Sequence, residues 1–254
     1  MMARAWPLAL LLAVWAALAA SAALPPFVLP APGAVFLRLV LEAPLLAWHA
    51  MVTLVEILAG LAIGLSLGGI VACLMQLSPR VARLAEPVLA ATQAVPVFVL
   101  APVLTIWLGY GLGPKIAMAV LLVFFPVATT LRDGMATLPE ATVDLARIAG
   151  ASRWQELRWL RLPHAMPHLA AGLKIAVTYA PTGAVIGEWI GASQGLGFLM
   201  LRANARMDTD LMFAALVIII CLTVALRATV ARLCVIFCGI EPADRAPART
   251  LPGH

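Results

Sequence analysis

Few residues of this chain have a type and spacing typical of a metal or catalytic site. Most of them lack the additional ligands or catalytic partners that such a site needs. His164 and His168 stand four residues apart, which places both imidazoles on one face of a helix and suits a metal ion. No third ligand stands near them, so the pair is not predicted to bind metal. The sequence also has no His-Glu-x-x-His motif, no Gly-x-Ser-x-Gly motif and no paired catalytic carboxylates. We therefore predict no catalytic residue and no enzyme activity.

The two lysines do not form a phosphate-binding loop. Lys115 follows Pro114 and Lys174 follows Leu173, whereas a Walker A motif has a glycine before its lysine. The four cysteines (Cys73, Cys221, Cys234 and Cys238) fit neither a zinc site nor a secreted disulfide framework, and are predicted to be small packing residues. The chain is therefore expected to bind no cofactor of its own.

The composition explains why residues suited to catalysis or metal binding are few, because 63% of the 254 residues are apolar and only 11% are charged. A soluble domain usually carries about 25% charged residues. So much apolar surface predicts a protein that lies in a bilayer and contacts lipid. The net charge of +5 then indicates basic loops on one side of the membrane rather than binding to nucleic acid.

The apolar runs predict an all-α polytopic membrane protein of about six transmembrane helices. The predicted spans are residues 8–24, 51–75, 85–108, 116–131, 167–190 and 211–235. The first run has features of a signal peptide, since small residues follow it, but it is about 26 Å long as a helix and other spans come after it. We expect it to be retained.

Three regions follow from these spans. Residues 1–34 form the first span and a linker, residues 35–238 form the transmembrane domain, and the proline-containing residues 239–254 form a disordered tail. Placing both termini in the cytoplasm leaves only Arg38, Lys115, Arg202 and Arg206 as basic loop residues on the outer side. This positive-inside bias predicts a multi-pass protein of a bacterial inner (plasma) membrane with both termini cytoplasmic.

Glycines recur at every fourth position of the second span, at Gly60, Gly64 and Gly68. They leave one face of the helix without side chains, so another helix can approach closely.

Polar groups inside the spans are candidates for a translocation path. Glu188, beside Trp189, either lines that path or pairs at the membrane interface with Arg202 or Arg206. Gln93 lies close to a helix break at Pro96 and either lines the path or forms an interhelical hydrogen bond. A second break is expected at Pro102, and Glu56 is expected to reach the outer interface.

Residues 132–166 form the longest cytoplasmic connection and are predicted to be structured. Thr137 with Glu140 and Ser152 with Gln155 have capping-box spacing, so one helix should begin near Leu138 and another near Arg153. Gly150 should end the first helix with a left-handed residue, and Pro163 should stop the second.

This loop has an apolar side, with Trp154, Leu157 and Leu160 together and with Arg153 and Glu156 facing away. It either docks on a partner, rests on lipid headgroups or is a passive connection, and its tryptophans serve as docking anchors or as interface aromatics.

The same loop resembles the EAA loop of ABC importer permeases. Asp144-Leu145-Ala146 precedes Gly150 at the family's spacing, and nine residues separate Gly150 from Leu160-Arg161-Leu162-Pro163. Asp144, Leu145 and Leu160 depart from the family's Glu, Ala and Ile, but keep charge sign or apolar character.

Other segments resemble the nitrate, sulfonate and taurine branch of these permeases. They are His49-Ala50 with Thr53-Leu54, residues 93–98 and residues 107–111. Residues 183–193 followed by Gly195-Leu196-Gly197, and residues 204–207 with 209–212, narrow the resemblance to permeases assigned to hydroxymethylpyrimidine, a thiamine precursor.

The resemblance implies a type I ABC importer permease fold that forms a translocation path. It implies a separate ATPase subunit that binds ATP and Mg²⁺, a periplasmic or lipid-anchored binding protein, and a second permease copy. The residues that it assigns to coupling with the ATPase are Asp144, Ala146, Gly150, Ala151, Ser152, Trp154, Leu162 and Pro163. Cargo within the branch is predicted to be hydroxymethylpyrimidine or a related precursor, with sulfonate, taurine or nitrate as the alternative. An ion-coupled secondary transporter is the alternative of another class; it would need carboxylates near the middle of the bilayer.

Overall fold

The computed structural model describes residues 6–21 and 24–238, and within these ranges every regular element is a helix. The tail 239–254, which the sequence predicts to be disordered, lies outside the described residues. The elements are α1 (Trp6–Ala20), α2 (Pro32–Leu41), α3 (Ala43–Leu77), α4 (Pro79–Ala94), α5 (Val97–Leu108), α6 (Leu112–Ala136), α7 (Glu140–Ile148), α8 (Arg153–Glu156), a π-helical turn (Leu157–Arg161), α9 (Leu162–Trp189), α10 (Leu196–Ala205) and α11 (Thr209–Cys238).

Four helical segments are long and apolar enough to cross a membrane: α3, α6, α11 and the continuous stretch Arg153–Trp189. The pair α4 and α5, bent by 105°, counts as a fifth if it is one broken span. With 15 residues, α1 is shorter than these, about 22 Å long. The described helices thus supply four or five spans. The first of the six predicted spans, residues 8–24, corresponds to the shorter helix α1.

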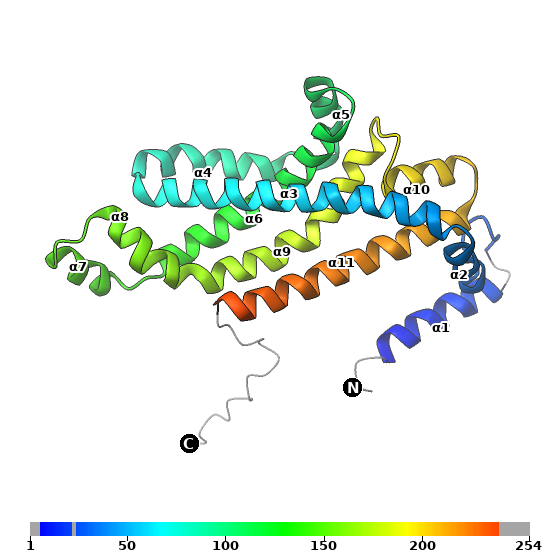
Figure 1. Ribbon diagram of the computed structural model, residues 1–254, viewed down its shortest axis with the longest axis horizontal. Coiled ribbons are helices and arrows are strands. Elements are labelled where there is room, and N and C mark those ends of the chain that lie inside the picture. Colours follow the sequence, from blue (N-terminus) through cyan, green and yellow to red (C-terminus); the bar gives the residue numbers. More distant parts are fainter. Residues whose placement is uncertain (1–5, 22–23, 239–254) are drawn as a thin grey trace, which may run out of the picture.

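The long helices α3, α6, α9 and α11 run side by side along the molecule (Figure 1). The predicted glycine face of α3 lies against α6, where a Cβ added at Gly60 would collide with Ala119 and one added at Gly64 would lie 2.6 Å from Val123. A cluster of buried residues joins α3 and α6 to α9: Ile57, Val123, Val127, Ala176, Ala180 and Ala184. The prediction of close helix packing is confirmed.

The break between α4 and α5 lies where the sequence predicts it, because Pro96 is the residue that precedes α5. Pro102, by contrast, lies inside α5 and does not interrupt it, so the second predicted break is wrong. From this break α5 projects away from the other helices (Figure 1), which leaves Ile106 and Trp107 largely exposed.

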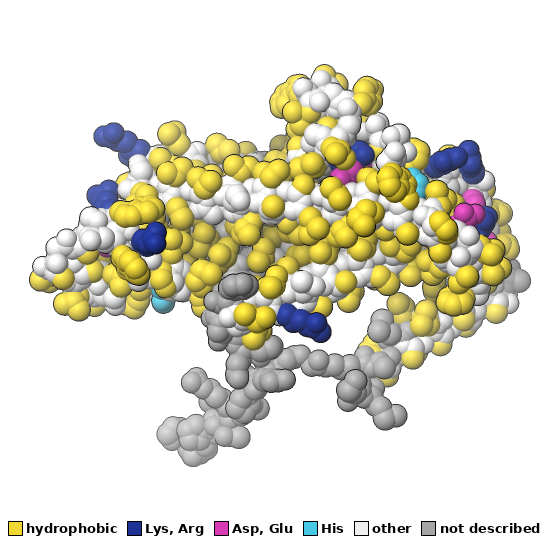
Figure 2. All heavy atoms as spheres, viewed as in Figure 1, with side chains coloured by type: hydrophobic (Ala, Val, Ile, Leu, Met, Phe, Trp, Pro, Cys, Tyr) yellow, Lys and Arg dark blue, Asp and Glu magenta, His cyan; other side chains and the backbone are white. Residues whose placement is uncertain are grey.

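The surface of the molecule is apolar over most of its length. Figure 2 shows hydrophobic side chains along the bundle, while Lys and Arg side chains gather mostly toward its two ends. A belt of this kind is what a bilayer requires of the surface that faces it.

Candidate functional site

The connection between α6 and α9 opens differently from the prediction. Here α7 begins at Glu140, preceded by Pro139 with extended backbone, and no side chain caps it. Thr137 instead bonds the carbonyl oxygen of Gly134 at 2.8 Å and contacts Nε2 of His164 at 3.1 Å. The predicted capping box at Thr137 is therefore wrong. The reason is that a residue before proline avoids helical backbone, so the helix cannot begin at Leu138.

Gly150 ends α7 as predicted. Its φ of +85° is left-handed, a conformation that an L side chain rarely adopts. The Gly150 amide donates to the Arg147 carbonyl and the Ala151 amide donates to the Ala146 carbonyl, each at 2.9 Å. This is the Schellman arrangement, in which the last carbonyls of the helix find partners in the turn.

The second predicted cap is also confirmed. The amide of Gln155 donates to the Ser152 hydroxyl at 3.3 Å, and the Ser152 amide donates to the Gln155 side chain at 2.8 Å. Pro163, however, does not stop the helix that begins here. The chain passes through one π-helical turn, with the Leu162 amide donating to the Leu157 carbonyl, into the first turn of α9, where proline is tolerated.

Glu156 has the opposite environment from the one predicted. It is buried, with its carboxylate 3.0 Å from Arg147 Nε on α7 and 4.0 Å from Arg161 at the end of the π-helical turn. Arg161 also donates to the Met135 carbonyl on α6 at 3.1 Å. This network ties α7 and the start of the long helix to α6, so the loop has a defined shape. Asp144 forms a mostly exposed pair with Arg147 at 3.6 Å, which contributes little stability.

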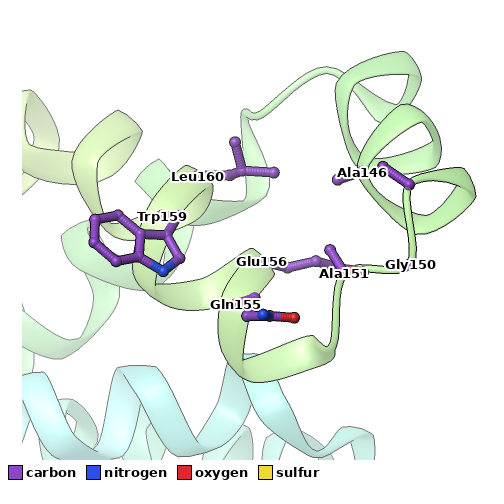
Figure 3. A pocket seen from close by; sticks show the side chains of 8 residues that line it. Ala146, Gly150, Ala151, Gln155, Glu156, Trp159 and Leu160 are labelled. Atoms are coloured by element: carbon purple, nitrogen blue, oxygen red, sulfur yellow. The ribbon is translucent and has the colours of Figure 1, made fainter.

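A group of large apolar side chains on this loop faces outward. Leu145, Ile148, Trp154 and Trp159 are 57% to 85% exposed. Leu157, predicted to share a side with Trp154, is instead buried in the bundle against residues of α3, α6 and α9. A hollow of about 350 Å³ lies between α7 and the π-helical turn (Figure 3). Its lining residues are Ala146, Ala149, Gly150, Ala151, Gln155, Glu156, Trp159 and Leu160. We name these exposed residues and the hollow the docking face, since small residues, apolar anchors and a fixed frame are what a protein partner binds.

The predicted path residues are not all in one place. Gln93 lines a hollow of about 380 Å³ with side chains from α6 and α9, and Trp189 lies elsewhere, packed edge-on against Phe98 of α5. The lining residues of the hollow are Gln93, Leu122, Phe125, Pro126, Thr129, Thr130, Ile175 and Tyr179. Tyr179 and the two threonines were not singled out from the sequence. Uncharged polar groups within apolar spans are the signal that could have found them.

In the structure Glu188 is buried inside the helix bundle. Glu188 is 1% exposed and lies between α3 and the start of α10. It accepts a hydrogen bond from the hydroxyl of Thr53 on α3 at 2.6 Å. Glu56 does not reach the interface. It is completely buried and pairs at 3.0 Å with Lys115, which lies in the first turn of α6 rather than in an outer loop. Both buried carboxyl groups have a polar partner, because a buried polar group without one is costly.

Among residues 6–21 and 24–238, no cluster of three His, Cys, Asp or Glu side chains has metal-ligand geometry.

Comparison with known proteins relates most of the chain to one family. Residues 60–234 match the family described as "Binding-protein-dependent transport system inner membrane component". A "Probable ABC transporter permease protein" of Haemophilus influenzae is 45% identical over 216 residues, which is 85% of this chain and 88% of that protein. Taurine and aliphatic sulfonate transport permeases also match, in line with the branch that the sequence resembles.

Two further relatives carry a cargo in their names. The formylaminopyrimidine transport permease of Halalkalibacterium halodurans is 36% identical over 195 residues, covering 76% of this chain and 78% of its own. The riboflavin transport permease of Chloroflexus aurantiacus is 37% identical over 221 residues, covering 86% and 82%.

A solved amino acid ABC transporter has the same fold. Its superposition gives a TM-score of 0.62 at 19% identity and covers 80% of this chain and 97% of that chain.

Proposed function

Because this chain belongs to the family of inner-membrane components of binding-protein-dependent transport systems and is an ABC importer permease, we propose that residues 132–166 couple it to a separate ATPase subunit. The docking face carries this proposal. Its four large apolar side chains stay exposed although the loop beneath them is held by Glu156 and by two helix caps. Burying one such side chain contributes about 1.5–3 kcal/mol, so a partner that covers several of them gains a stable interface.

The loop is also built to transmit motion. Residues Arg153–Trp189 form one continuous helical stretch that begins at the docking face and is long and apolar enough to cross a membrane. A displacement of the loop therefore moves the span itself. We propose that the ATPase binds ATP and Mg²⁺, that a second copy of the permease completes the path, and that the docking face and both termini lie in the cytoplasm.

For the cargo we propose hydroxymethylpyrimidine or a related thiamine precursor, delivered by a periplasmic or lipid-anchored binding protein. The hollow around Gln93 supports this choice. Its described lining has an amide, a phenol and two hydroxyls but no charged side chain, which suits a neutral heteroaromatic molecule better than a sulfonate or nitrate anion. A relative named for formylaminopyrimidine transport and another named for riboflavin transport carry ring systems of this kind.

Reconstitution tests both parts. The permease, its ATPase and its binding protein are placed in proteoliposomes, and uptake of labelled hydroxymethylpyrimidine and of taurine is measured with ATP inside or with an ion gradient alone. We expect ATP-dependent uptake of the pyrimidine. Taurine uptake without pyrimidine uptake would refute the cargo, and uptake driven by an ion gradient without ATP would refute the ATPase coupling.

A further inference from the structure

The start of α10 is held by side chains of other helices. The first amides of an α-helix have no partner within the helix. In α10 the amide of Gly197 donates to Oε2 of Glu188 at 2.5 Å, and the amide of Phe198 lies 3.4 Å from the same oxygen. Glu188 belongs to the last turn of α9, so its carboxylate joins the end of one helix to the start of the next.

Two side chains of α3 bind the amides just before these. The amide of Gly195 donates to Nδ1 of His49 at 2.9 Å, and that of Leu196 donates to the Thr53 hydroxyl at 2.8 Å. Thr53 in turn bonds Glu188 at 2.6 Å. Four successive amides are therefore satisfied by His49, Thr53 and Glu188, which we name the α10 clamp.

The clamp explains the Gly195-Leu196-Gly197 motif. A Cβ at Gly195 would collide with the carboxylate of Glu188, and one at Gly197 would lie 2.9 Å from Oε2. Gly195 also has a φ of +110°. The two glycines are required because the carboxylate occupies the space that their side chains would fill.

The clamp is shielded from solvent, and this strengthens its bonds. His49, Thr53 and Glu188 are at most 5% exposed. In such surroundings a hydrogen bond is stronger than in water, and a carboxylate that faces a helix N-terminus is favoured by the partial positive charge there. Further along α10, Leu201 and Arg202 are exposed at the end of the bundle remote from the docking face (Figure 1).

We infer that Glu188 and Thr53 are positioning residues that make α10 move as one body with α3 and α9. In a permease, α10 lies at the end opposite the ATPase loop, so an event at α10, such as arrival of the binding protein, is passed through the clamp to α9 and along it to the docking face. The inference rests on the permease assignment and adds a transmission step to it.

The experiment compares three variants with wild type in nanodiscs that contain the assembled transporter. Glu188→Leu removes the carboxyl group that accepts from the amides of Gly197 and Phe198. Thr53→Val removes the hydroxyl that accepts from the Leu196 amide, with little change in side-chain volume. Thr223→Val is the matched control, because the Thr223 hydroxyl donates to the Ile219 carbonyl within its own helix α11. ATP hydrolysis is measured with and without cargo-loaded binding protein, and hydrogen exchange is followed at the amides of residues 195–198.

In the two clamp variants we expect exchange at these amides to rise about tenfold or more. Basal ATP hydrolysis should persist, while its stimulation by the binding protein is lost. Thr223→Val should behave as wild type. Fast exchange with full stimulation would overturn the transmission role, and unchanged exchange would overturn the clamp itself. If Glu188→Leu does not assemble, Thr53→Val decides by the same two readings. Absence of stimulation by the binding protein in wild type would instead contradict the proposed coupling to the ATPase.

Discussion

Substitution of Gly150 separates backbone strain from side-chain size at the docking face. Its φ of +85° costs an ordinary L residue about 1–2 kcal/mol, while a Cβ added there meets nothing within 4 Å. The cost within the permease is therefore conformational and not steric. A penalty of this size lowers the equilibrium ratio of native to non-native turn by about 5- to 30-fold.

The substitutions Gly150→Asn, Gly150→Ala and Gly150→Val should therefore follow an order that size alone does not predict. Asn tolerates the left-handed region, Ala does so less readily, and a β-branched residue is a clear outlier there. Asn is larger than Ala, yet it should retain more of the Schellman turn. We expect coupling to fall in the order Gly, Asn, Ala, Val.

The assay is the number of cargo molecules imported per ATP hydrolysed in proteoliposomes. Gly69→Val is the control, because Gly69 has helical backbone and a Cβ there also meets nothing within 4 Å. If Ala couples better than Asn, the side chain obstructs the partner and strain is not the cause. Wild-type coupling in Gly150→Val would refute the importance of the turn.

Three further predictions concern the bundle. Gly64→Val should lower the free energy of unfolding by about 1–3 kcal/mol or prevent assembly, because the new side chain overlaps Val123; thermal unfolding in detergent measures this. Lys115→Met should cost about 3–5 kcal/mol by leaving Glu56 buried without its cation, and adding Glu56→Gln should recover much of the loss; a double variant as unstable as the single one would contradict the ion pair. Gln93→Leu should raise the KM for pyrimidine uptake and leave stimulated ATP hydrolysis unchanged; an unaltered KM would remove Gln93 from the path.

Local rules account for the features that were predicted correctly. The glycine face of α3, the break at Pro96, the left-handed turn at Gly150 and the cap at Ser152 each depend on a few neighbouring residues. Where the local rules gave a wrong prediction, a neighbouring feature of the backbone had the larger effect. Pro139 prevented the first cap, and the π-helical turn let the helix continue through Pro163.

The partners of the buried charges were decided by tertiary structure. Thr53 and Glu188 are 135 positions apart in the chain, and no spacing rule joins a carboxylate to the amides of a later helix. The same holds for Glu56 with Lys115 and for Glu156 with its two arginines.

By itself, the sequence determined that this protein is a bundle of membrane helices with a structured loop, because apolar length, glycine spacing and helix caps act over short stretches of chain. Only the tertiary structure decided that Glu188 binds the first amides of α10. A buried charge takes whichever donors the packed helices bring to it, and that choice is made in space.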